Sequence, residues 1–299
     1  MSNKTIMITG AGGFLGSELL KQLKNNKNDT IFAFDLEKVK NTGSKNLISF
    51  DYQDWKHKKI PFNKINCIIN CAFSRENKGS LLSDSLDFTK DLFLRAKSNL
   101  VNSVINISTQ SVYGEPSKPL WTENTPVTNN NLYALAKYST ELLAESIFSE
   151  PNSHTSFSNL RMASLIGVGF DNRLTNKFII NAINNRPIKI VGGEQILAFM
   201  DIRDAAEAIL SLINTNHKDW KKTFNLGSNK RHTLIEIAQI VKDTAKKYLK
   251  APVQIDIENK NVNMETGMDS SLFYSVTGWK PKYNLEDTID WIFCTYIKK

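Results

Sequence analysis

A glycine-rich turn between an apolar run and an amphipathic helix constrains the fold of this chain most strongly. The run Thr5–Thr9 is typical of a buried strand, and Gly10, Gly13 and Gly16 follow it at three-residue intervals. Glycines at this spacing permit a tight turn, close approach of the backbone to a pyrophosphate, and close packing of helix on strand. The helix predicted over 14–23 would direct its free N–H groups toward that pyrophosphate. The pattern therefore predicts a dinucleotide site at the start of an α/β fold.

Two carboxylates at predicted strand ends refine this hypothesis. Asp35 ends the strand predicted over 31–35, nineteen residues after Gly16. A carboxylate there can accept hydrogen bonds from both ribose hydroxyls and would repel a 2′-phosphate, which favours NAD over NADP. The alternative is that Asp35 only opens a turn. Asp51, at the end of the strand predicted over 47–51, either approaches the adenine edge or caps the strand end.

Strand and helix signals alternate through the first half of the chain. Further strands are predicted over 67–73 and 104–108, with a helix between them over 82–96. A polar loop at 115–131 follows, and then a helix over 132–149. This alternation predicts a Rossmann-like, doubly wound parallel sheet with helices on both faces. Later elements are predicted over 159–166, 189–191, 204–213, 223–227 and 233–247. We expect an NAD-binding domain over 1–165 and a smaller, mostly C-terminal substrate-binding lobe over 166–299, interleaved with late elements of the sheet.

A tyrosine and a lysine four residues apart open the helix predicted over 132–149. Tyr133 and Lys137 would share one helix face, where an ammonium group favours the phenolate and lowers a tyrosine pKa that is ordinarily about 10. The lysine can also bond a nicotinamide ribose. Alone, the pair is as consistent with a half-exposed tyrosine beside a surface lysine. Ser108 and Thr109 favour the catalytic interpretation, because hydroxyls that end a parallel strand face the ligand crevice.

Together these segments resemble the extended short-chain dehydrogenases/reductases, in the group of sugar-nucleotide epimerases and dehydratases. The resemblance covers nearly the whole chain and includes the glycine loop, Ser108–Gly114, the Tyr133–Lys137 pair, Leu160-Arg161, Gly167-x-Gly169, Asn225–Gly227 and Gly278–Pro281. It implies that Thr109 positions a substrate hydroxyl, that Tyr133 is the acid/base and that Lys137 is its partner. The residues expected at the cofactor are Gly10, Gly13, Phe14, Leu15, Gly16, Asp35, Asp51, Tyr52, Cys71, Ala72, Phe73, Tyr133 and Lys137.

Several departures from the family pattern limit what the resemblance implies. Gln110 and Ser111 stand where 4,6-dehydratases carry the Asp-Glu pair that performs elimination. Ser164 replaces an asparagine that helps to hold the substrate diphosphate, and Leu197 replaces an arginine before Phe199–Asp204. A second arginine, upstream of the Asp269 region, is also not evident. The candidate replacements for these guanidinium groups are Arg173, Lys177 and Lys260.

The residues and the resemblance together predict an NAD-dependent oxidoreductase that acts on a hydroxyl of a sugar or sugar nucleotide, in a 4-epimerase-like reaction. The alternatives are a keto-sugar reductase or dehydrogenase, and a non-catalytic dinucleotide-sensing protein. The resemblance also implies a homodimer that pairs helices 82–96 and 132–149. The net charge of +8 is the one feature that favours binding of nucleic acid. Because the lysines are scattered along the chain, we expect no nucleic-acid partner.

The cysteines and the apolar runs bear on the compartment. Cys67 and Cys71 lie in one predicted strand, which would separate their Cα atoms by roughly 13 Å, whereas a disulfide needs less than about 7 Å. We therefore expect buried thiols in a reducing compartment. The four histidines are dispersed, and no apolar run is long enough to span a membrane. These features, with no signal peptide evident, favour a cytoplasmic protein without a metal or a membrane partner.

Overall fold

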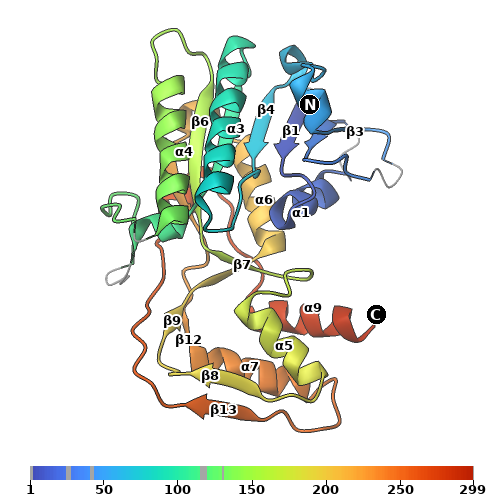
Figure 1. Ribbon diagram of the computed structural model, residues 1–299, viewed down its shortest axis with the longest axis vertical. Coiled ribbons are helices and arrows are strands. Elements are labelled where there is room, and N and C mark those ends of the chain that lie inside the picture. The colour runs from blue at the N-terminus through green and yellow to red at the C-terminus, as the bar shows by residue number, and fades with distance from the viewer. Residues whose placement is uncertain (1–2, 25–27, 41–43, 115–119, 130, 299) are drawn as a thin grey trace.

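A parallel sheet of seven strands forms the upper part of the molecule in Figure 1. The computed structural model describes residues 3–24, 28–40, 44–114, 120–129 and 131–298. The strand order is β11-β6-β5-β4-β1-β2-β3, and every pairing is parallel. The order reverses between β1 and β4, so their carboxyl ends border a crevice. The strands are β1 (Thr5–Thr9), β2 (Thr30–Phe34), β3 (Leu47–Phe50), β4 (Cys67–Asn70), β5 (Ser103–Thr109), β6 (Ser156–Met162) and β11 (Thr223–Leu226).

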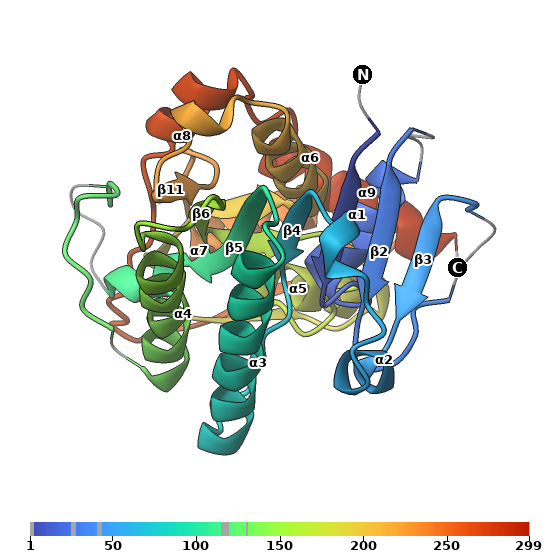
Figure 2. The same cartoon turned by 90° about the horizontal axis from the view of Figure 1, so that it is seen from above.

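Helices cover both faces of this sheet, which confirms the predicted doubly wound architecture (Figure 2). Successive side chains of β1 point to opposite faces: Ile6 and Ile8 join one buried cluster, and Met7 joins the other. The first cluster packs against α1 (Phe14–Leu23) and α6 (Ile202–Ile213). The second packs against α2 (Tyr52–Lys56), α3 (Gly79–Ser98) and α4 (Leu132–Phe148).

A smaller lobe lies below the carboxyl ends of the strands in Figure 1. Its core includes Ile179, Ile237 and Ile289, one from each of three helices. Residues beyond 166 also build β11 and α6 of the upper part, and the domain boundary at 165/166 stays a prediction. The lobe contains β7 (Ser164–Ile166), β8 (Ile188–Val191), β9 (Ile196–Leu197), β10 (Phe199–Asp201), β12 (His232–Thr233), β13 (Ile255–Glu258), α5 (Leu174–Ile183), α7 (Leu234–Ala245) and α9 (Leu285–Ile297). The remaining elements are α8 (Ser271–Thr277) and the 3₁₀ turns Phe62–Lys64, Gln110–Tyr113 and His217–Asp219.

Two predicted strands are shorter than the sequence indicated. The apolar run 159–166 is split between β6 and β7, because β6 pairs in the large sheet whereas β7 pairs with β10 of the lower lobe. The strand predicted over 67–73 ends at Asn70. The reason is that the Ala72 N–H donates a hydrogen bond to the Thr9 side chain at 3.3 Å and does not continue the backbone ladder of the sheet. Of the predicted polar loop, residues 115–119 and 130 lie outside the described residues, and 120–129 contain no helix.

Candidate active site

The glycine loop after β1 has the geometry that a dinucleotide requires. Gly10 adopts a φ of +63°, and a Cβ at this position would lie 2.8 Å from the Ala72 backbone nitrogen. The Gly13 N–H donates to the Gly10 carbonyl oxygen at 3.0 Å, and a Cβ on Gly16 would overlap that same oxygen. Larger residues would therefore force the loop away from β4. The tight turn leaves the start of α1 accessible, which fits a pyrophosphate bound by backbone N–H groups.

Asp35 lies at the rim of this loop, directly after β2. One carboxylate oxygen accepts the Gly12 N–H at 2.7 Å and the other accepts the Leu36 N–H at 2.7 Å. Each oxygen keeps a lone pair with which to accept a ribose hydroxyl. The Leu15 side chain is buried in the core, so only its backbone can serve a cofactor. The predicted cofactor contact of Asp35 fits this geometry and stays a prediction.

Asp51 follows β3 and caps the helix that comes next, whereas its place in the sequence predicted that it would cap the strand end or approach adenine. Its carboxylate accepts the Asp54 N–H at 2.9 Å at the start of α2, and the Asp54 carboxylate accepts the Asp51 N–H in return. This reciprocal pair is a capping box. Tyr52, the first residue of that helix, is exposed. Contact of Asp51 or Tyr52 with adenine remains a prediction.

We expect NAD to bind this protein roughly 10²-fold more tightly than NADP, because a 2′-phosphate beside Asp35 would place like charges together. Asp35→Ala should remove most of that difference, mainly by improving NADP binding. Dissociation constants of both cofactors from calorimetry would measure it. Asp87→Ala, which changes the same charge on the exposed side of α3, serves as the control. Equal affinities in the unmodified protein would contradict the role of Asp35.

The predicted catalytic residues converge at the carboxyl ends of β4 and β5. Asn131 caps α4 by accepting the Ala134 N–H at 2.8 Å, so Tyr133 and Lys137 occupy its first turns. The Lys137 ammonium lies 4.4 Å from the centre of the Phe73 ring, and the Tyr133 ring is 6.2 Å from the same ring. The structure thus brings the Tyr-Lys pair and the segment after β4 into one site.

The pKa values of these two groups show which charges act on them. Burial lowers the pKa of Lys137 to about 8. Burial raises the pKa of Tyr133, and the guanidinium of Arg75 and a hydrogen bond with the Thr109 side chain oppose that rise. Arg75 is thus a cation that acts on the Tyr133 pKa, and the Lys137 ammonium donates to the Ile107 carbonyl oxygen; the predicted effect of Lys137 on Tyr133 stays a prediction. Arg75 was not among the predicted site residues, although it follows the predicted cofactor segment by two residues.

Thr109 ends β5, and no carboxylate occupies the two positions that follow it. The Thr109 hydroxyl accepts the Ser111 N–H at 3.2 Å and donates to the Ser111 hydroxyl at 3.3 Å. The Gln110 side chain is buried, and its amide donates to the Ser164 hydroxyl at 3.3 Å. Cys71 lies near Lys137. Burial raises the pKa of the Cys71 thiol to about 12, so the thiol remains protonated at neutral pH.

A buried ion pair lies one helical turn beyond Lys137. The Glu141 carboxylate accepts two hydrogen bonds at 3.1 Å from Nε of Arg161 and one at 2.7 Å from Nη2, and it also accepts the Ser108 hydroxyl. Arg161 in turn donates to the Tyr113 hydroxyl at 2.9 Å, which donates to the Asn225 side chain at 2.6 Å. This network joins α4 to β5, β6 and β11 beneath the site. Leu160-Arg161 was recognisable as a motif in the sequence, but the ion-pair partner of Arg161 was not.

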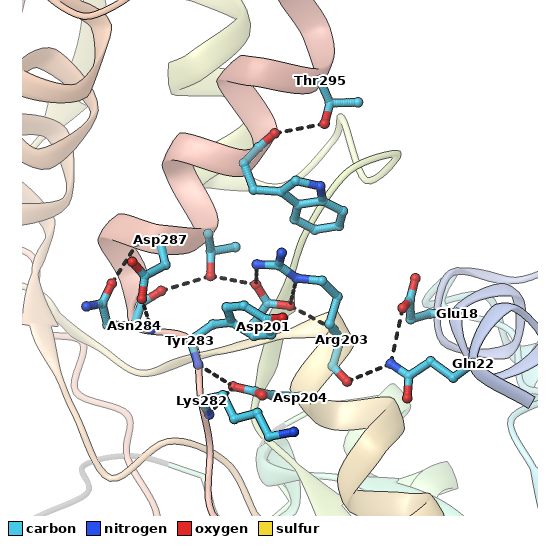
Figure 3. Close-up of polar contacts among 12 residues, drawn as sticks. Glu18, Gln22, Asp201, Arg203, Asp204, Lys282, Tyr283, Asn284, Asp287 and Thr295 are labelled. Atoms are coloured by element: carbon cyan, nitrogen blue, oxygen red, sulfur yellow. Dashed lines mark hydrogen bonds and ion pairs between the residues drawn. The ribbon is translucent and has the colours of Figure 1, made fainter. Parts of the chain in front are cut away.

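A second polar cluster joins the lower lobe to the cofactor helix (Figure 3). The Arg203 guanidinium lies between two rings, 3.6 Å from the centre of Tyr283 and 4.0 Å from that of Trp291, and bonds both carboxylate oxygens of Asp201. The Gln22 amide of α1 donates to the Arg203 carbonyl oxygen at 2.9 Å. The segment Phe199–Asp204, recognised in the sequence as a motif, therefore fixes the lobe against the cofactor-binding part.

Within the ranges that the structure describes, no group of three His, Cys, Asp or Glu side chains is arranged to hold a metal ion. In the same ranges no helix combines the length and the apolar character needed to cross a membrane.

Comparisons with known proteins agree with this geometry. The model of the NAD dependent epimerase/dehydratase family matches residues 6–227. The bifunctional polymyxin resistance protein ArnA of Wigglesworthia glossinidia brevipalpis is 28% identical over 275 residues, which span 80% of this chain but only 41% of that longer protein. UDP-glucuronic acid decarboxylase 6 of Arabidopsis thaliana is 25% identical over 96% of this chain and 87% of its own length.

Solved structures share the fold over the full length. The UDP-N-acetylglucosamine 4-epimerase from Bacillus cereus superposes with a TM-score of 0.83 at 21% identity, covering 98% of this chain and 99% of that one. At that identity the likeness shows the fold alone. The family model, by contrast, spans most of the sequence, including the glycine loop and the Tyr-Lys pair. The chain therefore belongs to the NAD dependent epimerase/dehydratase family, and it is an NAD-dependent enzyme.

Proposed function

We propose that this enzyme epimerises a sugar nucleotide by oxidising one ring hydroxyl and reducing the resulting ketone from its other face. One observation carries the proposal. Thr109, Tyr133 and Lys137 lie together in one site, whereas Gln110 and Ser111 place no acid or base next to them. This arrangement supports removal and return of a proton at one oxygen and offers nothing for elimination of water.

Each residue has a distinct part in the proposed reaction. Bound NAD supplies the acceptor, and later the donor, of the hydride. Tyr133 removes the hydroxyl proton, and Arg75 stabilises the phenolate that it uses for this step. Thr109 orients the substrate oxygen through its hydroxyl. Lys137, with a pKa of about 8, is mostly an ammonium at neutral pH and can bond the nicotinamide ribose.

The alternative is a reductase or dehydrogenase, for which the same residues suffice. The two reactions differ in their demand for cofactor: an epimerase returns its hydride to the substrate, whereas a reductase consumes NADH stoichiometrically. The presence of Thr109, Tyr133 and Lys137 in one site disfavours a protein that only senses the dinucleotide.

We expect incubation with the right sugar nucleotide to give its epimer with no net change in NADH absorbance and no dehydrated product. The physical reason is that an amide at Gln110 has no usable basic site and a lone serine hydroxyl at Ser111 is a weak acid. Screening sugar nucleotides by product NMR, with absorbance recorded in parallel, measures both quantities. Stoichiometric loss of NADH would favour the reductase, and accumulation of a 4-keto-6-deoxy sugar would contradict the proposal.

We also propose that two copies pair through α3 and α4. These helices lie side by side on the outside of the sheet (Figure 2), and they expose Leu94 (46%), Leu135 (49%) and Leu142 (49%). Apolar side chains grouped on an outer face are typical of an interface.

Light scattering at micromolar concentration should therefore give the mass of a dimer. Leu142→Asp should shift the protein to monomer, because the interface would then bury an unpaired charge. Ile257→Asp, which changes an equally exposed apolar residue on β13, should leave the dimer intact. A monomer in the unmodified protein would argue against this pairing.

We further propose that the enzyme works in the cytoplasm. Cys67, Cys71 and Cys294 are all free, and Cys67 is fully buried. Burial raises the pKa of the Cys67 thiol to about 11, which suits a structural thiol in a reducing compartment. Cell fractionation followed by labelling of free thiols tests this, and recovery of the protein outside the cytoplasm would contradict it.

A further inference from the structure

Two arginines from different parts of the chain converge on one ring beside the candidate active site. Arg75 follows β4, whereas Arg173 occupies the N-cap position of α5. Their guanidinium carbons lie 4.7 Å and 4.8 Å from the centre of the Phe170 ring. The same ring is 4.3 Å from the ring of Phe14, the first residue of the cofactor helix. The pair therefore sits where the lower lobe meets the cofactor-binding part.

Neither of these arginines has an acidic partner among the described residues. The Nε of Arg173 is buried and makes no hydrogen bond within the described part of the chain. Two guanidinium groups without a counter-charge at one ring favour the binding of an anion beside them. Four of the five other arginines are paired with carboxylates: Arg95, Arg161, Arg203 and Arg231.

The start of α5 adds further unpaired groups to the same place. Arg173 provides no side-chain cap, which leaves the first N–H groups of this ten-residue helix available to an anion. The hydroxyl of Thr175 and the amide oxygen of Asn176 belong to residues that are 0% exposed, and both lack a partner among the described residues. Buried polar atoms of native proteins are rarely left without a partner. The start of α5 therefore holds polar atoms whose hydrogen bonds are not made within the described part of the chain.

The segment that carries Phe170 and Arg173 is held in place by the last helix. The Tyr296 hydroxyl of α9 accepts the Gly169 N–H at 3.1 Å and the Asn176 amide at 3.2 Å, and it donates to Asp171. The Asn176 amide also donates to the Gly167 carbonyl oxygen at 2.9 Å. The arginine pair thus belongs to a built site and not to loose surface side chains.

The position of Arg75 relates this site to the chemistry. Its charge acts on both Tyr133 and Lys137, the pair to which we assign the proton transfer. Leu197, by contrast, leaves the expected diphosphate position without its arginine. The two arginines without an acidic partner therefore lie on the side of the site that holds Tyr133 and Lys137.

We propose that Arg75, Arg173 and the start of α5 bind an acidic group carried by the sugar itself, so that the substrate is an acidic sugar nucleotide. This inference rests on the proposed function and specifies its substrate class. A carboxylate would accept paired hydrogen bonds from the arginines, while Thr175 and Asn176 would bond a neighbouring hydroxyl.

Calorimetry on the NAD-loaded enzyme tests this with UDP-glucuronate and UDP-glucose, which differ only by the acid. We expect UDP-glucuronate to bind at least about 10-fold more tightly. Arg173→Met should weaken its binding by roughly 10- to 100-fold, the effect of losing a hydrogen bond to a charged group, with little change for UDP-glucose. Arg173→Lys should lose less. Arg186→Met, which removes an exposed charge just beyond α5, is the matched control and should change neither.

The same variants distinguish a substrate acid from the cofactor pyrophosphate. If Arg75→Met and Arg173→Met weaken NAD binding and leave the preference for UDP-glucuronate unchanged, the anion is the cofactor's and the proposal fails. Equal binding of the two sugar nucleotides to the unmodified enzyme would also overturn it. Because the readout is binding, selective binding without turnover would instead count against the proposed epimerisation and leave this inference standing.

Discussion

Tyr133→Phe is expected to lower kcat by roughly 10²- to 10⁴-fold, the usual contribution of a positioned acid–base group. The phenol is the group placed to exchange a proton with the substrate oxygen, and phenylalanine keeps its packing against Phe73 while removing only the hydroxyl. Affinity for NAD and the unfolding midpoint should therefore remain those of the unmodified enzyme. Steady-state rates with a sugar nucleotide identified by the screen, together with NAD titrations, measure the two effects separately.

Two companion variants make this result specific. Tyr138→Phe removes a hydroxyl from the same helix outside the proposed machinery and should leave kcat near its original value. Thr109→Ala should reduce kcat less than Tyr133→Phe, because it removes an orienting hydrogen bond and leaves the proton acceptor in place. If Tyr133→Phe retained near-normal turnover, the proton would have to pass through another group and the proposed mechanism would be wrong.

Removal of the Glu141 carboxylate is expected to cost about 3–5 kcal/mol of unfolding free energy, as for other broken buried ion pairs. The Arg161 and Glu141 side chains are only 7% and 4% exposed, so Glu141→Ala would leave a buried guanidinium without its counter-charge. Urea denaturation monitored by far-UV circular dichroism measures this loss. The double variant Glu141→Leu/Arg161→Met should recover much of the stability, because it removes both charges and keeps apolar volume.

An exposed ion pair supplies the comparison. Lys222 and Glu145 approach to 2.7 Å, but their side chains are 60% and 52% exposed. Glu145→Ala should therefore cost less than about 1 kcal/mol. If Glu141→Ala cost no more than Glu145→Ala, the network beneath the site would not contribute to stability in the way we infer.

The features that depend on neighbouring residues could be predicted from the amino-acid sequence. The turn from β1 into α1 was predictable, because Gly10, Gly13 and Gly16 meet steric demands that arise within one strand–turn–helix unit. The presence of Tyr133 and Lys137 on one helix face followed from helical spacing alone. The parallel sheet followed from the alternation of strands and helices, since parallel strands need crossover connections.

Contacts between residues far apart in the sequence became visible in the folded protein. Arg75 reaches Tyr133, and Arg173 joins Arg75 at one ring, because β4, α4 and α5 meet at the carboxyl edge of the sheet. A row of buried asparagines was hidden for the same reason: Asn70, Asn106 and Asn159 lie in strands that read as apolar, and bond one another only in the register of the folded sheet. Which charges meet depends on the packing of segments far apart in sequence, and residue spacing carries no information on that packing.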